Sequence, residues 1–356
     1  MDSSASPHRA APRPLSVYLG AAMTLPGVEP LAVENMVRGI QKYQAHGFRR
    51  AGGKLEVVWT GGGSTLSFCP AAGEKCGAVF LIPSMINGSE ILDLLPGKSF
   101  TRWMAEQGFN VYLLDWGNPA EDTTLQSLQD VTGRIVEIAS FIQQRTREPV
   151  EAVGYCMGGT LLLGAAADRP GLFGKLVLLS APWDFHAGDP RMMAQVMTGT
   201  PTALQLLEVR KALPVDWIQN IFARVNPALA IKKFSNFAAM AAGSAEEEMF
   251  IAVEDWLNGG HDLSAGVARA CILDWYGANK PAKGEWVDLS VLKNNPVLIV
   301  AADRDILVPP ESALAATKTL SHASAIRPDC GHISLMAGKN AQQTVWLPVR
   351  TWLGQK

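Results

Sequence analysis

The sequence predicts an α/β fold with a mostly parallel central sheet and helices on both faces of it. Short apolar runs alternate with longer amphipathic segments from residue 78 to residue 181, and the alternation resumes near residue 296. Apolar runs of this length are typical of strands covered on both faces, and their alternation with helices indicates parallel pairing. The chain has 356 residues, of which 48% are hydrophobic, so it can bury a large core.

The elements are expected in a definite order along the chain. Residues 30–46 carry apolar side chains at helical spacing, and residues 54–69 indicate two strands joined by a glycine turn. Strands are then expected at AVFLIP, NVYLLDW, VEAVGYC and KLVLLSAP, with helices at KSFTRWMAEQG, VTGRIVEIASFIQQRT and GTLLLGAAADRP. The C-terminal part adds a strand at NPVLIVAADRD, a helix at PESALAATKTL, a weak strand at ASAIRPD and a final helix after Gly331.

This pattern divides the chain into four regions. Residues 1–50 are expected to form an N-terminal tail and helix, with the first ~15 residues, rich in Ser, Ala and Pro, as a loose tail. Residues 51–185 and 291–356 are the two parts of the α/β core. Residues 186–290 are helical and rich in Met, Trp and Phe, and we interpret them as an inserted helical cap. The alternative for this region is additional helical packing without a lid role.

Charge and cysteine content exclude several classes of partner. A formal net charge of -2 provides no basic field for nucleic acid. The cysteines lack CxxC spacing, which favours reduced thiols over disulfides or a zinc site, and we expect no metal and no other cofactor. The start of the chain shows no secretion signal, and no run reaches the ~18 apolar residues of a membrane span. We therefore expect a cytoplasmic protein. The cysteines are Cys69, Cys76, Cys156, Cys271 and Cys330.

Cys156 lies where an apolar run gives way to a helical one, in the segment VEAVGYCMGGT. In the pattern G-x-nucleophile-x-G a strand turns sharply into a helix, and Gly154 and Gly158 provide the small flanking residues that such a turn requires. The helix N-terminus favours a thiolate, and the backbone N–H of Met157 is a candidate oxyanion donor. The alternative is a buried cysteine that acts as a small apolar residue.

A nucleophile of this kind needs a base and an orienting acid, which follow it in the chain order nucleophile, acid, histidine. His332 follows a short strand in a Gly-His loop, and Asp305 follows the apolar strand before it. Asp303 is the alternative acid, two residues away. The alternative for His332 is a structural role, since a Gly-His turn can cap a helix.

A second oxyanion donor is expected from the loop PSMINGSEILD, which follows the first parallel strand. The candidates are backbone N–H groups near Ile86 or Asn87, with the Asn87 side chain as a further contributor. The alternative is an ordinary polar loop. A Cys-His-Asp site suits acyl transfer from a thioester, because an enzyme thioester exchanges with a substrate thioester at little cost in free energy.

Several segments together resemble the polyhydroxyalkanoate synthases, which are polymerases with the α/β-hydrolase fold. They include PSMINGSEILDLLPGKSFTRWMAEQGFNVYLLDWGNP, GYCMGGT, LLSAPWDF, WLNGGHDLS, DWYGANK, VDLSVLKNNPVLIVAADRDILVPP and CGHISLMAG, and they cover roughly residues 77–338 in one order. The nucleophile, acid and base of that family fall on Cys156, Asp305 and His332. The chain is most similar to the short catalytic subunits of classes III and IV, and it departs from the polymerases at Ile306, where they usually carry histidine.

The resemblance implies polymerisation of short 3-hydroxyacyl-CoA into polyester, with release of CoA. It also implies a polyester granule as partner and a granule-associated location, with a second synthase subunit and a homodimer as open questions. Two alternatives remain at this point. One is a cysteine-dependent α/β hydrolase, either a thioesterase or an enzyme like dienelactone hydrolase, and the other is a non-catalytic relative that binds polyester granules.

Overall fold

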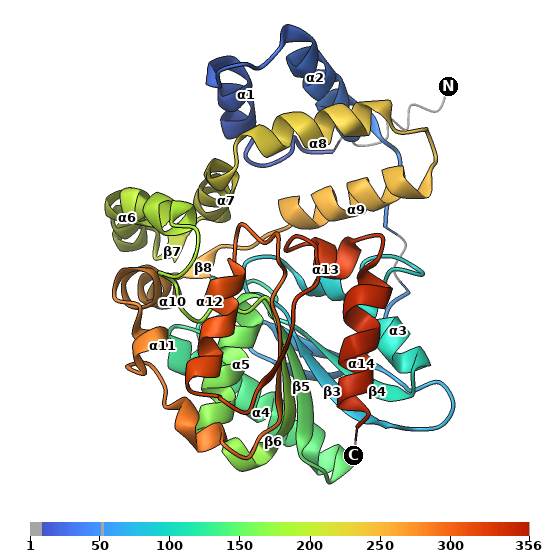
Figure 1. Cartoon of the computed structure of the whole chain (residues 1–356), viewed down its shortest axis with the longest axis vertical. Coiled ribbons are helices and arrows are strands. Elements are labelled where there is room, and N and C mark those ends of the chain that lie inside the picture. Colours follow the sequence, from blue (N-terminus) through green and yellow to red (C-terminus); the bar gives the residue numbers. More distant parts are fainter. Residues whose placement is uncertain (1–8, 51–52, 356) are drawn as a thin grey trace.

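The computed structural model describes residues 9–50 and 53–355 of the chain (Figure 1). Within these residues, eight strands form one sheet in the order β1-β2-β4-β3-β5-β6-β9-β10. β1 and β2 form an antiparallel hairpin, β2 pairs antiparallel with β4, and every other neighbouring pair is parallel. The predicted α/β fold is confirmed. The strands are β1 (Glu56–Gly61), β2 (Ser64–Cys69), β3 (Gly77–Ile82), β4 (Phe109–Asp115), β5 (Val150–Tyr155), β6 (Phe173–Leu179), β9 (Val297–Val300) and β10 (Ser324–Ile326).

The central strands are buried on both faces, as their continuous apolar runs predict. Phe80 and Ile82 of β3 pack into one hydrophobic cluster, whereas Val79 and Leu81 pack into the cluster on the opposite face. Side chains alternate across a strand, so an unbroken apolar run supplies both layers. One face is covered by α4 (Leu128–Thr146) and α5 (Met157–Asp168), and the other by α3 (Phe100–Glu106) and α14 (Leu347–Leu353).

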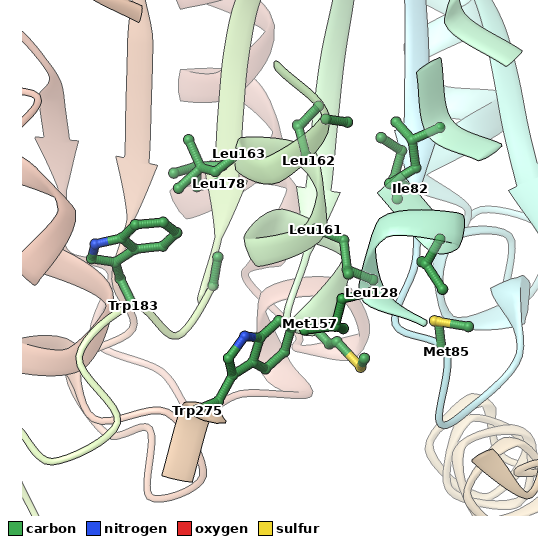
Figure 2. Close-up of a cluster of buried hydrophobic side chains, with 14 of the residues drawn as sticks. Ile82, Met85, Leu128, Met157, Leu161, Leu162, Leu163, Leu178, Trp183 and Trp275 are labelled. Carbon is green, nitrogen blue, oxygen red and sulfur yellow. The ribbon is translucent and has the colours of Figure 1, made fainter. Parts of the chain in front are cut away.

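Figure 2 shows part of the cluster between α5 and the sheet. Leu163 of α5 lies beside Leu178 of β6, and Leu162 points toward Ile82 of β3. Leu161 lies closer to the start of the helix, and all three leucines are at most 1% exposed. This packing fixes α5 against the strands, and it thereby fixes the position of the residue that precedes the helix.

The segment between β6 and β9, residues 180–296, leaves the sheet and returns to it on the neighbouring strand. We call it the inserted segment; it lies above the sheet and to its left in Figure 1. It is mainly helical, with a short antiparallel pair, β7 and β8. Its elements are α6 (Arg191–Arg210), β7 (Ala212–Leu213), α7 (Val215–Val225), α8 (Ala228–Ala239), α9 (Ala245–Asn258), β8 (Leu263–Ser264), α10 (Ala265–Ala270), a π-helical turn (Cys271–Gly277), α11 (Lys280–Lys283) and a 3₁₀ turn (Leu289–Leu292).

The N-terminal part packs on the inserted segment rather than on the sheet. α2 (Pro30–Ala45) matches the predicted helix, and it buries Met36 and Tyr43 against Phe234 and Phe237 of α8. α1 (Leu15–Thr24) was not predicted, because its apolar side chains are spread around the helix rather than along one stripe. Figure 1 shows both helices next to α8.

The predicted loose tail is wrong from Arg9 onward, while residues 1–8 lie outside the described part of the chain. The Arg9 side chain is 6% exposed and pairs with Asp255 of α9. Its guanidinium also donates to the backbone carbonyls of His46 and Phe48. A cation with this many acceptors is held in place, and Ser-, Ala- and Pro-rich composition alone does not reveal it.

In the C-terminal part, each of the two predicted helices is divided into shorter helical elements. The helix expected at residues 310–320 is α12 (Pro310–Leu314) followed by a 3₁₀ turn. The helix expected after Gly331 is α13 (Ser334–Ala337), which ends at Gly338, followed by a π-helical turn and α14. Among the described residues, no helix combines the length and the apolar character that crossing a membrane requires.

Candidate active site

Cys156 occupies the turn between β5 and α5, as the sequence predicts. Its backbone has φ 55° and ψ -129°, a conformation that non-glycine residues rarely adopt. The backbone N–H of Cys156 donates to the carbonyl of Leu179 at 2.8 Å, which anchors the turn to β6. The Cys156 side chain is half-buried and lines a cavity at this edge of the sheet.

The two flanking glycines are required by close backbone approach. A Cβ atom at Gly158 would overlap the carbonyl groups of Ile82 and Pro83, and a Cβ atom at Gly154 would overlap the backbone of Gly159. The start of α5 therefore lies directly against the end of β3. This contact explains why the pattern G-x-C-x-G occurs at this position.

His332 and Asp305 meet at the same edge. The Nδ1 atom of His332 lies 2.6 Å from Oδ2 of Asp305. The other carboxylate oxygen of Asp305 accepts hydrogen bonds from the backbone N–H groups of Leu307 and Val308, both at 2.9 Å. Asp305 is 4% exposed, so this carboxylate is buried, fully hydrogen-bonded and fixed in orientation.

The alternative acid, Asp303, points elsewhere. Its carboxylate accepts a hydrogen bond from Arg327 at 2.7 Å and lies at the surface. The choice between the two aspartates therefore follows from the geometry: Asp305 contacts His332, whereas Asp303 forms an exposed ion pair.

The His332 imidazole lies between Asp305 and Cys156. Burial lowers the pKa of His332. The charges of Asp305 and Cys156 and hydrogen bonds to both side chains raise the pKa by more than burial lowers it, so the net pKa is well above the ordinary value. A protonated imidazole is the partner that stabilises a thiolate, which is the nucleophilic form of cysteine. The three side chains chosen from the sequence are thus brought together in one contiguous group.

Tyr155 supports the histidine and was missed in the sequence. Its ring lies 5.2 Å from the His332 ring, centroid to centroid, and its hydroxyl donates to the His332 carbonyl at 3.3 Å. The only sequence signal was its place immediately before Cys156, at the end of a buried strand. Tyr155 fixes the loop that carries the imidazole.

Met157 is the first residue of α5. The N–H of such a residue has no acceptor within its own helix, and it lies at the positive end of the helix dipole. Figure 2 shows the Met157 side chain at the start of α5, below Leu128. The backbone N–H next to Cys156 is consistent with the expected oxyanion donor, and that role remains a prediction.

The expected contribution of the Asn87 side chain to the oxyanion site needs correction. The Asn87 amide nitrogen donates to the carbonyls of Trp256 and Leu257 at 3.1 and 3.2 Å. These bonds use both of its hydrogens, so the side chain ties the loop to α9 instead of serving Cys156. The Ile86 N–H is also engaged, because it donates to the Ser84 hydroxyl at 3.2 Å. A second donor from the backbone of this loop remains a prediction.

The cavity next to Cys156 has a volume of about 140 Å³ and is lined mainly by apolar side chains. The core contributes Cys156 and His332, whereas the inserted segment supplies more than half of the lining residues. Among the residues that the structure describes, no group of three or more His, Cys, Asp or Glu side chains is arranged to hold a metal ion. Large members from the inserted segment are Trp217, Ile221, Trp256, Trp275 and Tyr276.

Comparison with known families agrees with this architecture. Residues 79–339 match the family described as alpha/beta hydrolase fold, which is more than half of the chain. The chain belongs to the alpha/beta hydrolase fold family. The turn at Cys156 is the place where this fold is expected to carry its nucleophile, and Asp305 and His332 follow it in the order expected for the acid and base; these roles remain predictions.

The curated relatives of this alpha/beta hydrolase fold protein include poly(3-hydroxyalkanoate) polymerase subunits named PhaC. The one from Haloferax mediterranei is 27% identical over 78% of this chain and 58% of its own length. The one from Synechocystis is 26% identical over 78% of both chains. A third, from Rhizobium meliloti, is 35% identical over 31% of this chain and 19% of its own length. The resemblance to the polyhydroxyalkanoate synthases is thereby confirmed.

Solved structures agree on the fold of this alpha/beta hydrolase protein. A monoacylglycerol lipase from Paleococcus ferrophilus superposes with a TM-score of 0.53 at 18% identity, covering 81% of this chain and 98% of its own. A carboxylesterase from Nitrososphaera gargenis gives a TM-score of 0.51 at 9% identity, covering 82% and 95%. At these identities the likeness concerns the fold alone.

Proposed function

We propose that the protein is an acyltransferase that polymerises short 3-hydroxyacyl-CoA into polyester, using Cys156, His332 and Asp305 and releasing CoA. The observation that carries the proposal is the 2.6 Å contact between His332 and Asp305, with His332 and Cys156 both in the wall of an apolar cavity. The curated relatives named as poly(3-hydroxyalkanoate) polymerase subunits support this substrate class.

The first half-reaction follows from the arrangement of the three side chains. His332 takes the proton of the Cys156 thiol, and the thiolate attacks the carbonyl carbon of the acyl-CoA thioester. The negative charge that develops on the carbonyl oxygen faces the N–H of Met157 at the start of α5. The tetrahedral intermediate collapses, the carbon–sulfur bond to CoA breaks, and His332 returns its proton to the departing CoA thiolate. The acyl group is left on Cys156.

The second half-reaction extends the polyester. The 3-hydroxyl of another acyl unit loses its proton to His332 and attacks the acyl thioester on Cys156, so that an ester bond forms and the thiol is released. Asp305 holds the imidazole in position throughout, because its second oxygen is fixed by the N–H groups of Leu307 and Val308.

The inserted segment acts in this proposal as a cap over the reacting groups. It contributes most of the cavity wall, and its α9 contacts the loop after β3 through the amide of Asn87. An apolar enclosure excludes water, and this favours transfer to a hydroxyl over hydrolysis. We propose residues 186 and 290 as the boundaries of this cap.

The proposed partners follow from the proposed reaction. They are 3-hydroxyacyl-CoA and the polyester granule that the product forms, with a second synthase subunit or a second copy of this chain as assembly partner. We propose a cytoplasmic location in contact with the granule.

Ile306 favours a second candidate, a cysteine-dependent thioester hydrolase. Ile306 packs against the hydrophobic core and supplies no polar group beside Asp305. If no residue there directs the hydroxyl of a second acyl unit, water is the alternative acceptor of the acyl group.

One experiment separates these functions. Purified protein is incubated with 3-hydroxybutyryl-CoA while CoA release and the fate of the acyl group are followed. Insoluble polyester supports the polymerase and free 3-hydroxybutyrate supports the hydrolase. Absence of CoA release contradicts both and supports a granule-binding relative without activity.

The nucleophile is tested with matched cysteine variants. Cys156→Ala should reduce CoA release by at least ~10³-fold, and Cys156→Ser should leave weak activity at most, because a hydroxyl is far less ionised than a thiol. Cys76→Ala removes an exposed thiol and should leave the rate unchanged. Turnover that survives in Cys156→Ala would show that another group forms the acyl-enzyme.

A further inference from the structure

The π-helical turn Cys271–Gly277 presents several side chains to the cavity. The backbone N–H of Ala278 donates to the carbonyl of Leu273, five residues earlier, at 2.8 Å, which is the bond that widens a helix into a π turn. The turn places Cys271, Ile272, Trp275 and Tyr276 in the cavity wall. Of these four side chains, Tyr276 alone carries a hydroxyl.

Tyr276 is held firmly by its neighbours. Its carbonyl oxygen is hydrogen-bonded to Nε2 of His186 at 2.6 Å. Its ring packs edge-on against Phe185, with 4.9 Å between the ring centroids. Backbone and ring are thus fixed by residues 185 and 186, which lie in the first part of the inserted segment, between β6 and α6.

Tyr276 is half-buried and lines the cavity, and no hydrogen bond of its hydroxyl is found within the described part of the chain. Burial raises the pKa of Tyr276, and the charge of Cys156 raises it further. The phenol therefore keeps its proton at neutral pH. Tyr276 and Cys156 line the same cavity.

Several other polar groups of the cavity are already engaged. The Asn87 amide nitrogen donates to the carbonyls of Trp256 and Leu257, and His332 is paired with Asp305. The indole N–H of Trp275 has no partner, but it is sealed in packing. The Tyr276 hydroxyl differs from these groups because it has no partner among the described residues and belongs to a half-buried side chain of the cavity wall.

An unpaired donor in an apolar cavity discriminates between ligands. A ligand oxygen placed there completes a hydrogen bond, whereas a ligand without that oxygen leaves the hydroxyl desolvated and unpaired. A 3-hydroxyacyl group on Cys156 has two oxygens that can accept a hydrogen bond, the carbonyl oxygen and the 3-hydroxyl oxygen. Its carbonyl oxygen faces the start of α5 in the core, so the donor from the inserted segment is left for the substituent farther along the acyl chain.

We infer that the Tyr276 hydroxyl donates a hydrogen bond to the 3-hydroxyl oxygen of the acyl group, so that the site selects 3-hydroxyacyl thioesters over unsubstituted acyl thioesters. This inference rests on the proposed function, namely that an acyl thioester reaches Cys156 with its carbonyl oxygen at the start of α5. It assigns Tyr276 as a specificity-determining residue that takes no part in the proton transfers at His332.

The test measures binding, so that it does not depend on turnover. The dissociation constants of 3-hydroxybutyryl-CoA and butyryl-CoA are determined by calorimetry for Cys156→Ala, which cannot be acylated, with and without Tyr276→Phe. In the double variant, 3-hydroxybutyryl-CoA should bind about ten-fold more weakly, while butyryl-CoA should change by less than about two-fold. Phenylalanine keeps the ring that packs on Phe185, so the turn is retained.

The matched control is Tyr112→Phe, which removes a hydroxyl from a tyrosine that packs on Phe68 in the sheet and lies outside the cavity. It should change neither dissociation constant. Equal weakening of both thioesters by Tyr276→Phe, no weakening of either, or no preference for the hydroxylated thioester in Cys156→Ala alone would overturn the inference. Failure of the proposed function is distinguished separately, by the absence of CoA release from the unaltered chain.

Discussion

The guanidinium of Arg9 forms a two-point ion pair with the carboxylate of Asp255, with Nε–Oδ1 at 2.8 Å and Nη2–Oδ2 at 3.2 Å. Asp255 directly precedes Trp256, which lines the cavity beside Cys156. The N-terminal segment thus holds the end of α9 from one side, while Asn87 holds it from the other. Residues distant in sequence therefore fix one wall of the candidate active site.

Replacing Arg9 should destabilise the protein. Arg9→Ala removes the pair with Asp255 and one of the two arginine donors to the carbonyls of His46 and Phe48, which then keep only Arg49 among the described residues. We therefore expect a loss of about 1–3 kcal/mol in the free energy of unfolding. Urea denaturation measures this loss in the free energy of unfolding. Arg269→Ala breaks an ion pair whose side chains are 42% and 66% exposed, and it should cost less than about 0.5 kcal/mol. Equal costs for the two variants would contradict the assigned role of Arg9.

Asn87 should act on stability rather than as an oxyanion donor. Asn87→Ala removes two hydrogen bonds to carbonyls of α9, and we expect a loss of about 2 kcal/mol in the free energy of unfolding. Asn220→Ala removes an exposed amide that bonds only to its own helix, and it should change stability by less than about 0.5 kcal/mol. If Asn87→Ala instead lowered the rate of CoA release by about 10²-fold with stability unchanged, the side chain would be an oxyanion donor after all.

The turn at Cys156 should not tolerate a side chain at Gly158. Because a Cβ atom there would overlap the carbonyls of Ile82 and Pro83, Gly158→Ala should destabilise the fold by about 2–4 kcal/mol. Gly133→Ala is the matched control, since a Cβ atom at Gly133 in α4 meets no neighbour, and it should raise stability by about 0.5–1 kcal/mol. Thermal unfolding of both variants checks the opposite signs, and a harmless Gly158→Ala would refute the close contact between α5 and β3.

His332 should contribute a pH-dependent part of the stability. Its pKa in the folded protein is raised well above 6.5, so the folded state binds the proton more tightly than the unfolded chain. The resulting stabilisation is fully present below about pH 6.5 and is lost as the pH rises through the raised pKa. His332→Gln should therefore cost more free energy of unfolding near pH 6 than near pH 10.

The pH dependence has its own control. In Asp305→Asn the carboxylate that contributes to the raised pKa of His332 is absent, so the difference between the two pH values should shrink when His332→Gln is made in that background. A cost of His332→Gln that grows toward high pH would contradict the direction of the shift.

The sheet was predictable because its strands carry unbroken apolar runs. In β3 the run fills both hydrophobic layers, with Phe80 on one face and Leu81 on the other, and such a run differs clearly from an amphipathic helix. α1 gave no such signal, since it lacks a single apolar stripe. The buried place of Arg9 depends on α9, about 250 residues away in the chain, and local composition carries no information about such a partner.

The three candidate catalytic residues were predictable for a different reason. The backbone at Cys156 requires glycines at fixed positions, and the fold brings Asp305 and His332 to the same edge in a fixed chain order. The roles of Asn87 and Tyr276 were not accessible in this way. Each depends on which atoms of the inserted segment happen to lie nearby, and a sequence pattern specifies element types but not the partners of single polar atoms.

The chain leaves the sheet after β6 and returns to it on the neighbouring strand β9, and this has a consequence for how the protein can change in evolution. Because β6 pairs directly with β9, residues 180–296 form a closed excursion whose two ends meet. Lengthening, shortening or replacing this segment leaves the hydrogen bonds between the strands of the sheet unchanged. It also leaves the turn that carries Cys156 unchanged. Most of the cavity wall and the group of Cys156, Asp305 and His332 are thus encoded in separate stretches of the polypeptide, so the wall can change in evolution while this group stays constant.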